Sequence, residues 1–90
     1  MSEQVRVWLV ERTFSDDEQN LVILTYATPD GDREFRKERA LTTYSDERPT
    51  RVSLDVAERD LSAVGDPETR RRYAEEVART AAAHDPGDEL

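Results

Sequence analysis

One segment near the C-terminus has the full pattern of an amphipathic helix, and this limits the fold more than any other feature. Asp66 can cap free backbone N–H groups and Pro67 suits the first helical position, so the helix begins there. It continues to about Ala83, where Asp85-Pro86-Gly87 ends it. Its predicted apolar stripe consists of Tyr73, Ala74, Val77, Ala78 and Ala81. A single helix can cover only one face of the structure formed by the preceding residues.

The preceding residues have the patterns of β-strands. Residues 3–14 alternate, so one face carries Val5, Val7 and Leu9, and the other carries Arg6, Trp8, Val10, Arg12 and Phe14. Residues 21–28 are apolar on both faces, which is typical of a central strand. Pro29-Asp30-Gly31-Asp32 predicts a tight turn, because Pro fixes φ and Gly supplies a positive φ. The remaining predicted strands are residues 33–43 and 51–56.

The order β-β-β-β-α predicts an α+β fold: a four-stranded antiparallel sheet with the C-terminal helix packed on one face. Ninety residues fill only one core, so we expect a single domain over residues 1–84. Residues 85–90 are predicted to form a disordered tail. Residues 57–65 are compatible with a helical turn that packs Leu61 and Val64.

The charge composition indicates an environment. Asp and Glu total 21, Lys and Arg total 13, the net charge is −8, and Lys37 is the only lysine. An acidic excess with almost no lysine resembles the small uncharacterised proteins of halophilic archaea. That resemblance implies a cytoplasmic protein adapted to molar salt, and it implies no activity. At ~1 M salt the Debye length is about 3 Å, so repulsion between carboxylates is largely screened.

Several functional classes lack the residues that they need. The chain has no cysteine and one histidine, His84, so we expect no metal site and no cofactor. The glycines do not form a phosphate-binding loop, and no serine lies in a nucleophile elbow. No run of residues predicts a signal peptide or a membrane span. We therefore expect no enzyme, although the many carboxylates, including Asp16-Asp17-Glu18, leave a carboxylate-based enzyme as one alternative.

The leading hypothesis is a non-enzymatic binding or interaction module that works in high salt. The first two strands carry apolar residues on both faces, whereas one helix covers one face. Either residues 57–65 fold over the second face, or a partner covers it, most simply a second copy in a homodimer. If the strand faces align, the predicted partner-contact residues are Trp8, Val10, Phe14 and Tyr26.

A nucleic-acid-binding module is the first alternative. Basic residues surround an aromatic residue on the third predicted strand, a pattern that sheet proteins use to hold single strands. The candidates are Arg33, Phe35, Arg36, Lys37 and Arg39. The β-β-β-β-α order also resembles the single-stranded-DNA-binding folds of the transcription-coactivator type. The net charge of −8 opposes this alternative, because phosphate contacts depend on a basic footprint and weaken steeply in salt.

Overall fold

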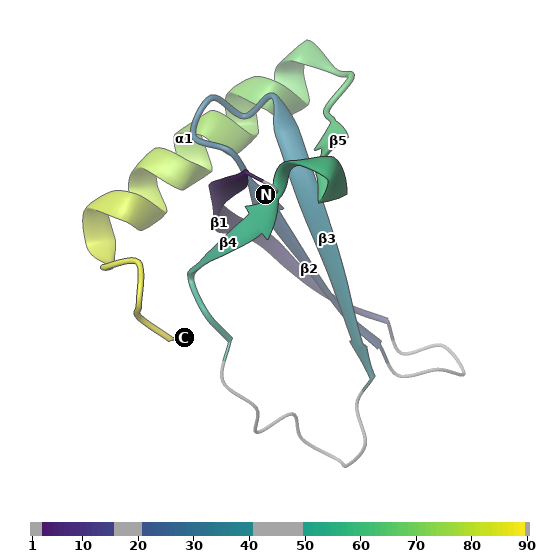
Figure 1. Ribbon diagram of the computed structural model, residues 1–90, viewed down its shortest axis with the longest axis vertical. Coiled ribbons are helices and arrows are strands. Elements are labelled where there is room, and N and C mark those ends of the chain that lie inside the picture. Colours follow the sequence, from purple (N-terminus) through teal and green to yellow (C-terminus); the bar gives the residue numbers. More distant parts are fainter. Residues whose placement is uncertain (1–2, 16–20, 41–49, 90) are drawn as a thin grey trace.

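The computed structural model describes residues 3–15, 21–40 and 50–89, which form an antiparallel sheet and one C-terminal helix (Figure 1). The elements in chain order are β1 (Gln4–Ser15), β2 (Leu21–Ala27), β3 (Arg33–Ala40), β4 (Ser53–Ala57), the 3-10 helix η1 (Glu58–Asp60), β5 (Ser62–Ala63) and α1 (Pro67–Ala83). The predicted α+β class is confirmed. The sheet has five strands rather than four, because the short strand β5 pairs with the start of β3. The predicted strand residues 41–43 lie outside the described residues.

The strand order is β4-β1-β2-β3-β5, with every neighbouring pair antiparallel. Strands β2 and β3 are joined by the predicted tight turn, in which Gly31 has a φ of 74°. The Asp30 carboxylate holds this turn by accepting hydrogen bonds from the Thr28 hydroxyl and from the Asp32 backbone N–H. The turn chemistry in the sequence thus fixes the hairpin that positions β3 against β2.

A β-bulge at Val10 changes which side chains of β1 share a face. Leu9 pairs with Tyr26, and Glu11 pairs with the next β2 residue, Thr25, so Val10 is an extra residue in β1. One extra residue moves all later side chains to the opposite face. Arg12 and Phe14 therefore lie on the face of Val7 and Leu9, whereas uninterrupted alternation predicted them beside Trp8.

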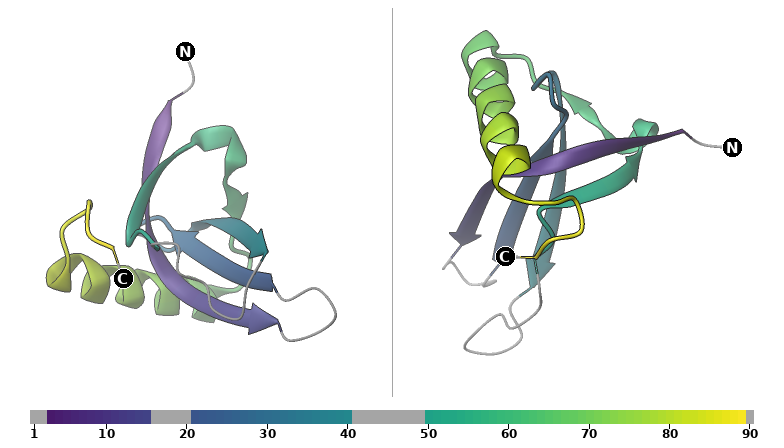
Figure 2. Two further views of the ribbon diagram at one scale, coloured as in Figure 1. Left: turned by 90° about the horizontal axis from the view of Figure 1, so that it is seen from below. Right: turned by 90° about the vertical axis from the view of Figure 1, so that its left-hand side faces the viewer.

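The sheet is strongly curved, because its two edge strands are neighbours in the sequence. A flat five-stranded sheet would separate β4 from β5 by about 19 Å. Here only η1 and Leu61 connect them, and a 3-10 helix rises just ~2 Å per residue. Figure 2 shows the result: β1 bends and carries β4, η1 and β5 round towards β3. We call the inner side of this curve the concave face and the outer side the convex face.

The concave face holds the larger of the two hydrophobic clusters. Its buried residues are Val7, Leu9, Val22, Leu24, Tyr26 and Val56, with Phe35, Leu54 and Leu61 packed against them. The second apolar face of the first two strands is thus enclosed by the curvature of the sheet. Leu61 packs against this cluster. This agrees with the sequence alternative in which residues 57–65 fold over the second apolar face. The homodimer stays a prediction, but the described part of the first two strands leaves no large apolar face for it to cover.

Helix α1 packs on the convex face, outside the curve (Figure 2). The cluster between helix and sheet contains Trp8, Ala27, Val52, Val64, Tyr73 and Val77, with Val10 at its margin. Of the predicted apolar stripe, only Tyr73 and Val77 are buried and Ala74 is half-buried, whereas Ala78 and Ala81 are exposed. The predicted cap is confirmed, since the Asp66 carboxylate accepts a hydrogen bond from the Thr69 backbone N–H at 3.3 Å. Among the described residues, no helix is long and apolar enough to cross a membrane.

Residues 85–89, expected from the sequence to be a disordered tail, form a turn that returns to the sheet. The Asp88 backbone N–H donates to the Asp85 carbonyl, and the Asp88 carbonyl accepts from the Val52 N–H at 3.1 Å. Arg51 and Glu89 form an isolated antiparallel bridge. Backbone hydrogen bonds, which the residue composition of the tail does not encode, hold this segment in place.

Candidate functional site

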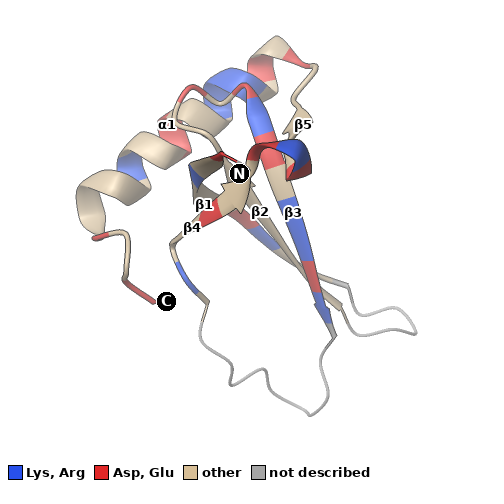
Figure 3. Cartoon of the chain, in the orientation of Figure 1, with Lys and Arg blue, Asp and Glu red and all other residues tan. Residues whose placement is uncertain are grey.

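The central strands sort their charges between the two faces of the sheet. By register, the concave face of β1, β2 and β3 carries Arg12, Arg33, Lys37 and Arg39. The carboxylates of these strands, Glu11, Glu34 and Glu38, all lie on the convex face, so the described part of the concave face has none from β1 to β3. Figure 3 shows the basic residues of β3 interspersed with acidic ones along the strand. The sorting is notable because the chain as a whole has a net charge of −8.

The cations that lie on the convex face are paired. Arg6 donates to the Asp55 carboxylate at 2.9 Å and to the Ser53 hydroxyl at 3.0 Å. Arg36 lies 3.5 Å from Glu34 on its own strand. These side chains therefore balance local carboxylates.

Strand pairing arranges four concave-face side chains around two apolar residues of β2. Arg12 and Lys37 both pair with Leu24, so these three residues form one row across the sheet. Phe14 and Arg39 both pair with Val22 and form the next row. Two strand spacings separate the flanking residues of each row by about 10 Å. We call the four flanking side chains, Arg12, Phe14, Lys37 and Arg39, the basic–aromatic frame.

Three of the four frame side chains are exposed to solvent. Phe14 is 60% exposed, and among the described residues no other large hydrophobic side chain is exposed to this degree. The guanidinium carbon of Arg12 lies 5.7 Å from the Phe14 ring centroid, which is within the range of a cation–π contact. Arg12 and Lys37 are exposed, and neither forms an ion pair with any residue that the structure describes. An aromatic ring and two cations are therefore available to a ligand here.

The fourth frame side chain, Arg39, is half-buried and is held by a hydrogen bond. Arg39 donates from Nη2 to the Thr50 hydroxyl at 3.2 Å. The buried Tyr26 hydroxyl donates to the Arg51 carbonyl oxygen at 2.7 Å. Burial raises the pKa of Tyr26, and the positive charges of Arg39 and Arg51 oppose that increase. The positive charge of Arg39, a frame residue, therefore also acts on the Tyr26 hydroxyl.

The four predicted partner-contact residues do not form one surface. Trp8 and Val10 face helix α1 on the convex side, whereas Phe14 and Tyr26 lie on the concave side. Trp8 is 8% exposed and Tyr26 is 1% exposed, so neither is available to a partner. The prediction assumed that the faces align across the strands. The register instead pairs Tyr26 with Leu9 rather than with Trp8, and the bulge at Val10 moves Phe14 away from the face of Trp8.

The five nucleic-acid candidates are also divided. Arg33, Phe35, Lys37 and Arg39 lie on the concave face, and Arg36 lies on the convex face. Arg33 lies 3.4 Å from Glu58 at the rim, and Phe35 is half-buried with its ring 6.5 Å from that of Tyr26. Lys37 and Arg39 therefore remain as candidates in the frame. Sequence reasoning did not place Arg12 and Phe14 beside them, because the bulge has no glycine or other local signal. It left out Arg12 and named Phe14 only as a partner contact.

The carboxyl groups with shifted pKa values act within their own turns. The Thr28 hydroxyl and then the Asp32 N–H lower the pKa of Asp30. The Thr69 hydroxyl lowers the pKa of Asp66. Both shifts keep the carboxyl ionised, whereas a general acid needs a raised pKa. The predicted cluster Asp16-Asp17-Glu18 lies outside the described residues.

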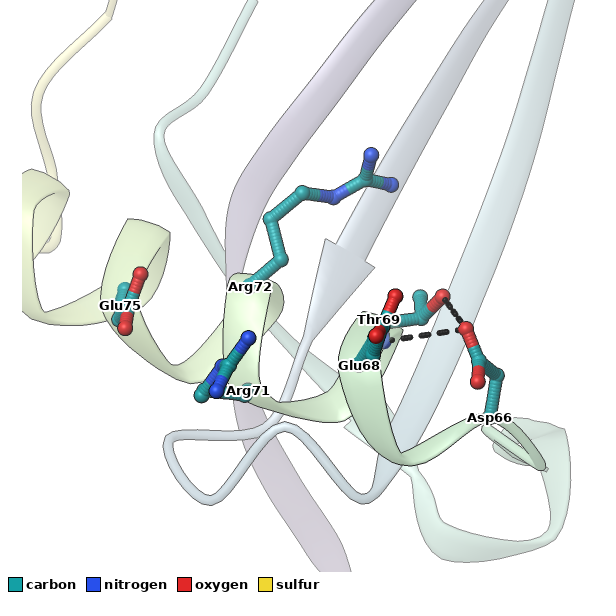
Figure 4. Close-up of a pocket in the computed structure, with 6 residues that line it drawn as sticks. All are labelled: Asp66, Glu68, Thr69, Arg71, Arg72 and Glu75. Atoms are coloured by element: carbon teal, nitrogen blue, oxygen red, sulfur yellow. Dashed lines mark hydrogen bonds between the residues drawn. The ribbon is translucent and has the colours of Figure 1, made fainter.

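A surface hollow over the first turns of α1 offers no converging groups. Its lining residues, shown in Figure 4, come from the helix and its cap: Asp66, Glu68, Thr69, Arg71, Arg72 and Glu75. Asp66 is bonded to Thr69 in this hollow, and the other charged side chains are exposed. His84 lies 3.6 Å from Asp88 at the far end of the helix. No group of three or more metal-ligating side chains occurs in the part of the chain that the structure describes.

Comparison with known proteins gives one match. A family model described as "Family of unknown function (DUF7967)" matches residues 1–90. No curated protein matches, and no solved structure matches. The geometry of the concave face is therefore the main basis for an inference about function.

Proposed function

The chain belongs to DUF7967, a family of unknown function, and we propose that it is a binding module that holds an anionic partner on its concave face. The observation that carries this proposal is the separation of charge: Arg12, Lys37 and Arg39 share one face of β1 to β3, and the carboxylates of these strands lie on the other. The concave face thus has a local excess of positive charge, although the chain as a whole has a net charge of −8.

The frame suits recognition by direct contact. Long-range steering of an anion to a protein of net charge −8 is unfavourable, and salt shortens its range further. Short-range contacts to guanidinium and ammonium groups persist better, because opposite charges then meet within hydrogen-bonding distance. We propose that binding without chemical conversion is the function, and that it takes place in the salt-rich cytoplasm that the composition implies.

The test compares two double variants with the same change in net charge. Arg12→Gln/Lys37→Gln removes the exposed cations of the frame, and Arg71→Gln/Arg72→Gln removes exposed cations of helix α1. Binding of oligo(dT), poly-L-glutamate and heparin is measured by fluorescence anisotropy at several KCl concentrations. We expect the frame variant to lose about tenfold in affinity for the preferred anion relative to the helix variant, equivalent to about 1.4 kcal/mol. Equal losses in the two variants would show that only net charge matters and would refute the proposal.

A further inference from the structure

We infer that the anionic partner of the concave face is a single-stranded nucleic acid, with a base stacked on Phe14 and phosphates held by Arg12 and Lys37. This inference rests on the proposed function and assigns the chemical class of its ligand. Its central observation is the position of Phe14, which is 60% exposed between cations rather than packed in either hydrophobic cluster.

An exposed aromatic ring among cations favours nucleic acid over an acidic peptide. Carboxylates of a peptide would be recognised by the cations alone, and the ring would add little. A nucleotide offers both a phosphate for the cations and a planar base for the ring, and base–aromatic stacking tolerates any sequence. The guanidinium carbon of Arg12 lies 5.7 Å from the Phe14 ring centroid, so one nucleotide can contact the cation with its phosphate and the ring with its base.

The exposed ring of the frame favours a single strand over a duplex. The bases of a duplex are paired and stacked inside the helix and cannot reach such a ring. The bases of an unpaired strand are free to stack on the ring of Phe14, which is 60% exposed.

The aromatic contact explains how an acidic protein could hold nucleic acid in high salt. Phosphate contacts weaken as salt rises, because each one releases condensed counterions. Stacking involves no counterion release, so its contribution persists when the charges are screened. The ring of Phe14 would therefore carry a growing share of the binding free energy as the salt concentration increases.

The first experiment uses oligo(dT) and an abasic oligonucleotide of the same length, which has the same phosphates but no bases. Wild-type protein should prefer oligo(dT), and Phe14→Ala should lower its affinity for oligo(dT) by about 5- to 150-fold. The same variant should bind the abasic strand as wild type does. Phe14→Tyr should retain the preference for bases, and Phe14→Leu should lose it, because leucine keeps apolar bulk without a π-face.

Salt dependence separates the two kinds of contact. The slope of log affinity against log salt should fall by about 1.4 in Arg12→Gln/Lys37→Gln, since each phosphate contact on a single strand contributes about 0.7. Phe14→Ala should leave the slope unchanged. Unchanged Trp8 fluorescence in each variant verifies folding, because Trp8 is 8% exposed in the helix–sheet cluster.

The outcomes distinguish this inference from the proposed function. Equal affinity for oligo(dT) and the abasic strand, or stronger binding of poly-L-glutamate, would overturn the nucleic-acid inference while leaving an anion-binding face. If no anion binds in a manner that depends on Arg12 and Lys37, both the inference and the proposed function fail.

Discussion

A β-carbon added to Gly31 would lie 2.0 Å from the carbonyl oxygen of Arg70, because the turn between β2 and β3 packs directly against the backbone of helix α1. The same atom would lie 3.0 Å from the backbone nitrogen of Ala74. Backbone atoms within a helix cannot move aside as a flexible side chain can. The predicted turn thus also sets the distance between the hairpin and the helix, a role that its sequence pattern does not indicate.

Gly31→Ala should lower the free energy of unfolding by about 3 kcal/mol or more. The positive φ of 74° costs a non-glycine residue about 1–3 kcal/mol, and the contact with Arg70 adds to that cost. Chemical denaturation measures the change. Gly65→Ala is the matched control, because its added β-carbon meets nothing within 4 Å, and we expect a change within about 0.5 kcal/mol. Similar losses in both variants would contradict the packing of the turn on the helix.

Tyr26→Phe should destabilise the protein by about 0.5–1.5 kcal/mol, because it removes the hydrogen bond from the buried hydroxyl to the Arg51 carbonyl at 2.7 Å. Tyr73→Phe is the control: Tyr73 is 3% exposed, and its hydroxyl forms no hydrogen bond with the described residues. Denaturation of the two variants should therefore give different losses. A smaller loss for Tyr26→Phe than for Tyr73→Phe would show that the Tyr26–Arg51 bond does not fasten the start of β4.

The Asp30 carboxylate should contribute stability that disappears in acid. Hydrogen bonds from the Thr28 hydroxyl and the Asp32 N–H lower its pKa in the folded state below that of the unfolded chain, which is about 3.9. The contribution is therefore complete above the unfolded pKa and is lost as pH falls through the folded pKa. Wild type minus Asp30→Asn isolates this contribution from the other carboxylates. The difference in unfolding free energy should shrink from about pH 5 to pH 2, and a constant difference would contradict the assignment.

The sequence predicts those parts of the fold that depend on local signals. Alternation locates the strands, Pro29 to Asp32 identifies the hairpin turn, and Asp66 with Pro67 marks the start of the helix. Each signal acts within a few neighbouring residues, so tertiary structure is not needed to interpret it. Where the structure describes them, the four predicted strands and the helix agree with it for this reason, whereas β5 was not predicted.

The candidate site depends on features without a local signal. The bulge at Val10 is fixed by pairing with β2, and it alone brings Arg12 and Phe14 to the face of Lys37 and Arg39. The curvature arises because the β4–η1–β5 segment joins the two edges of the sheet, which alternation within one strand cannot reveal. Lys37 and Arg39 were therefore predictable as part of a basic strand, whereas the position of Arg12 and Phe14 beside them was not.

Salt should stabilise this protein through its charges, and Trp8 provides the probe. Lowering KCl from molar to millimolar concentration lengthens the Debye length and restores repulsion within a chain of net charge −8. We expect a lower melting temperature, a weaker near-UV circular dichroism signal and greater exposure of Trp8, which is 8% exposed where helix α1 meets the sheet. The helix should loosen first, because it joins the sheet through a small cluster, whereas the strands share continuous backbone pairing. If the melting temperature is the same at both salt concentrations, carboxylate repulsion does not govern stability.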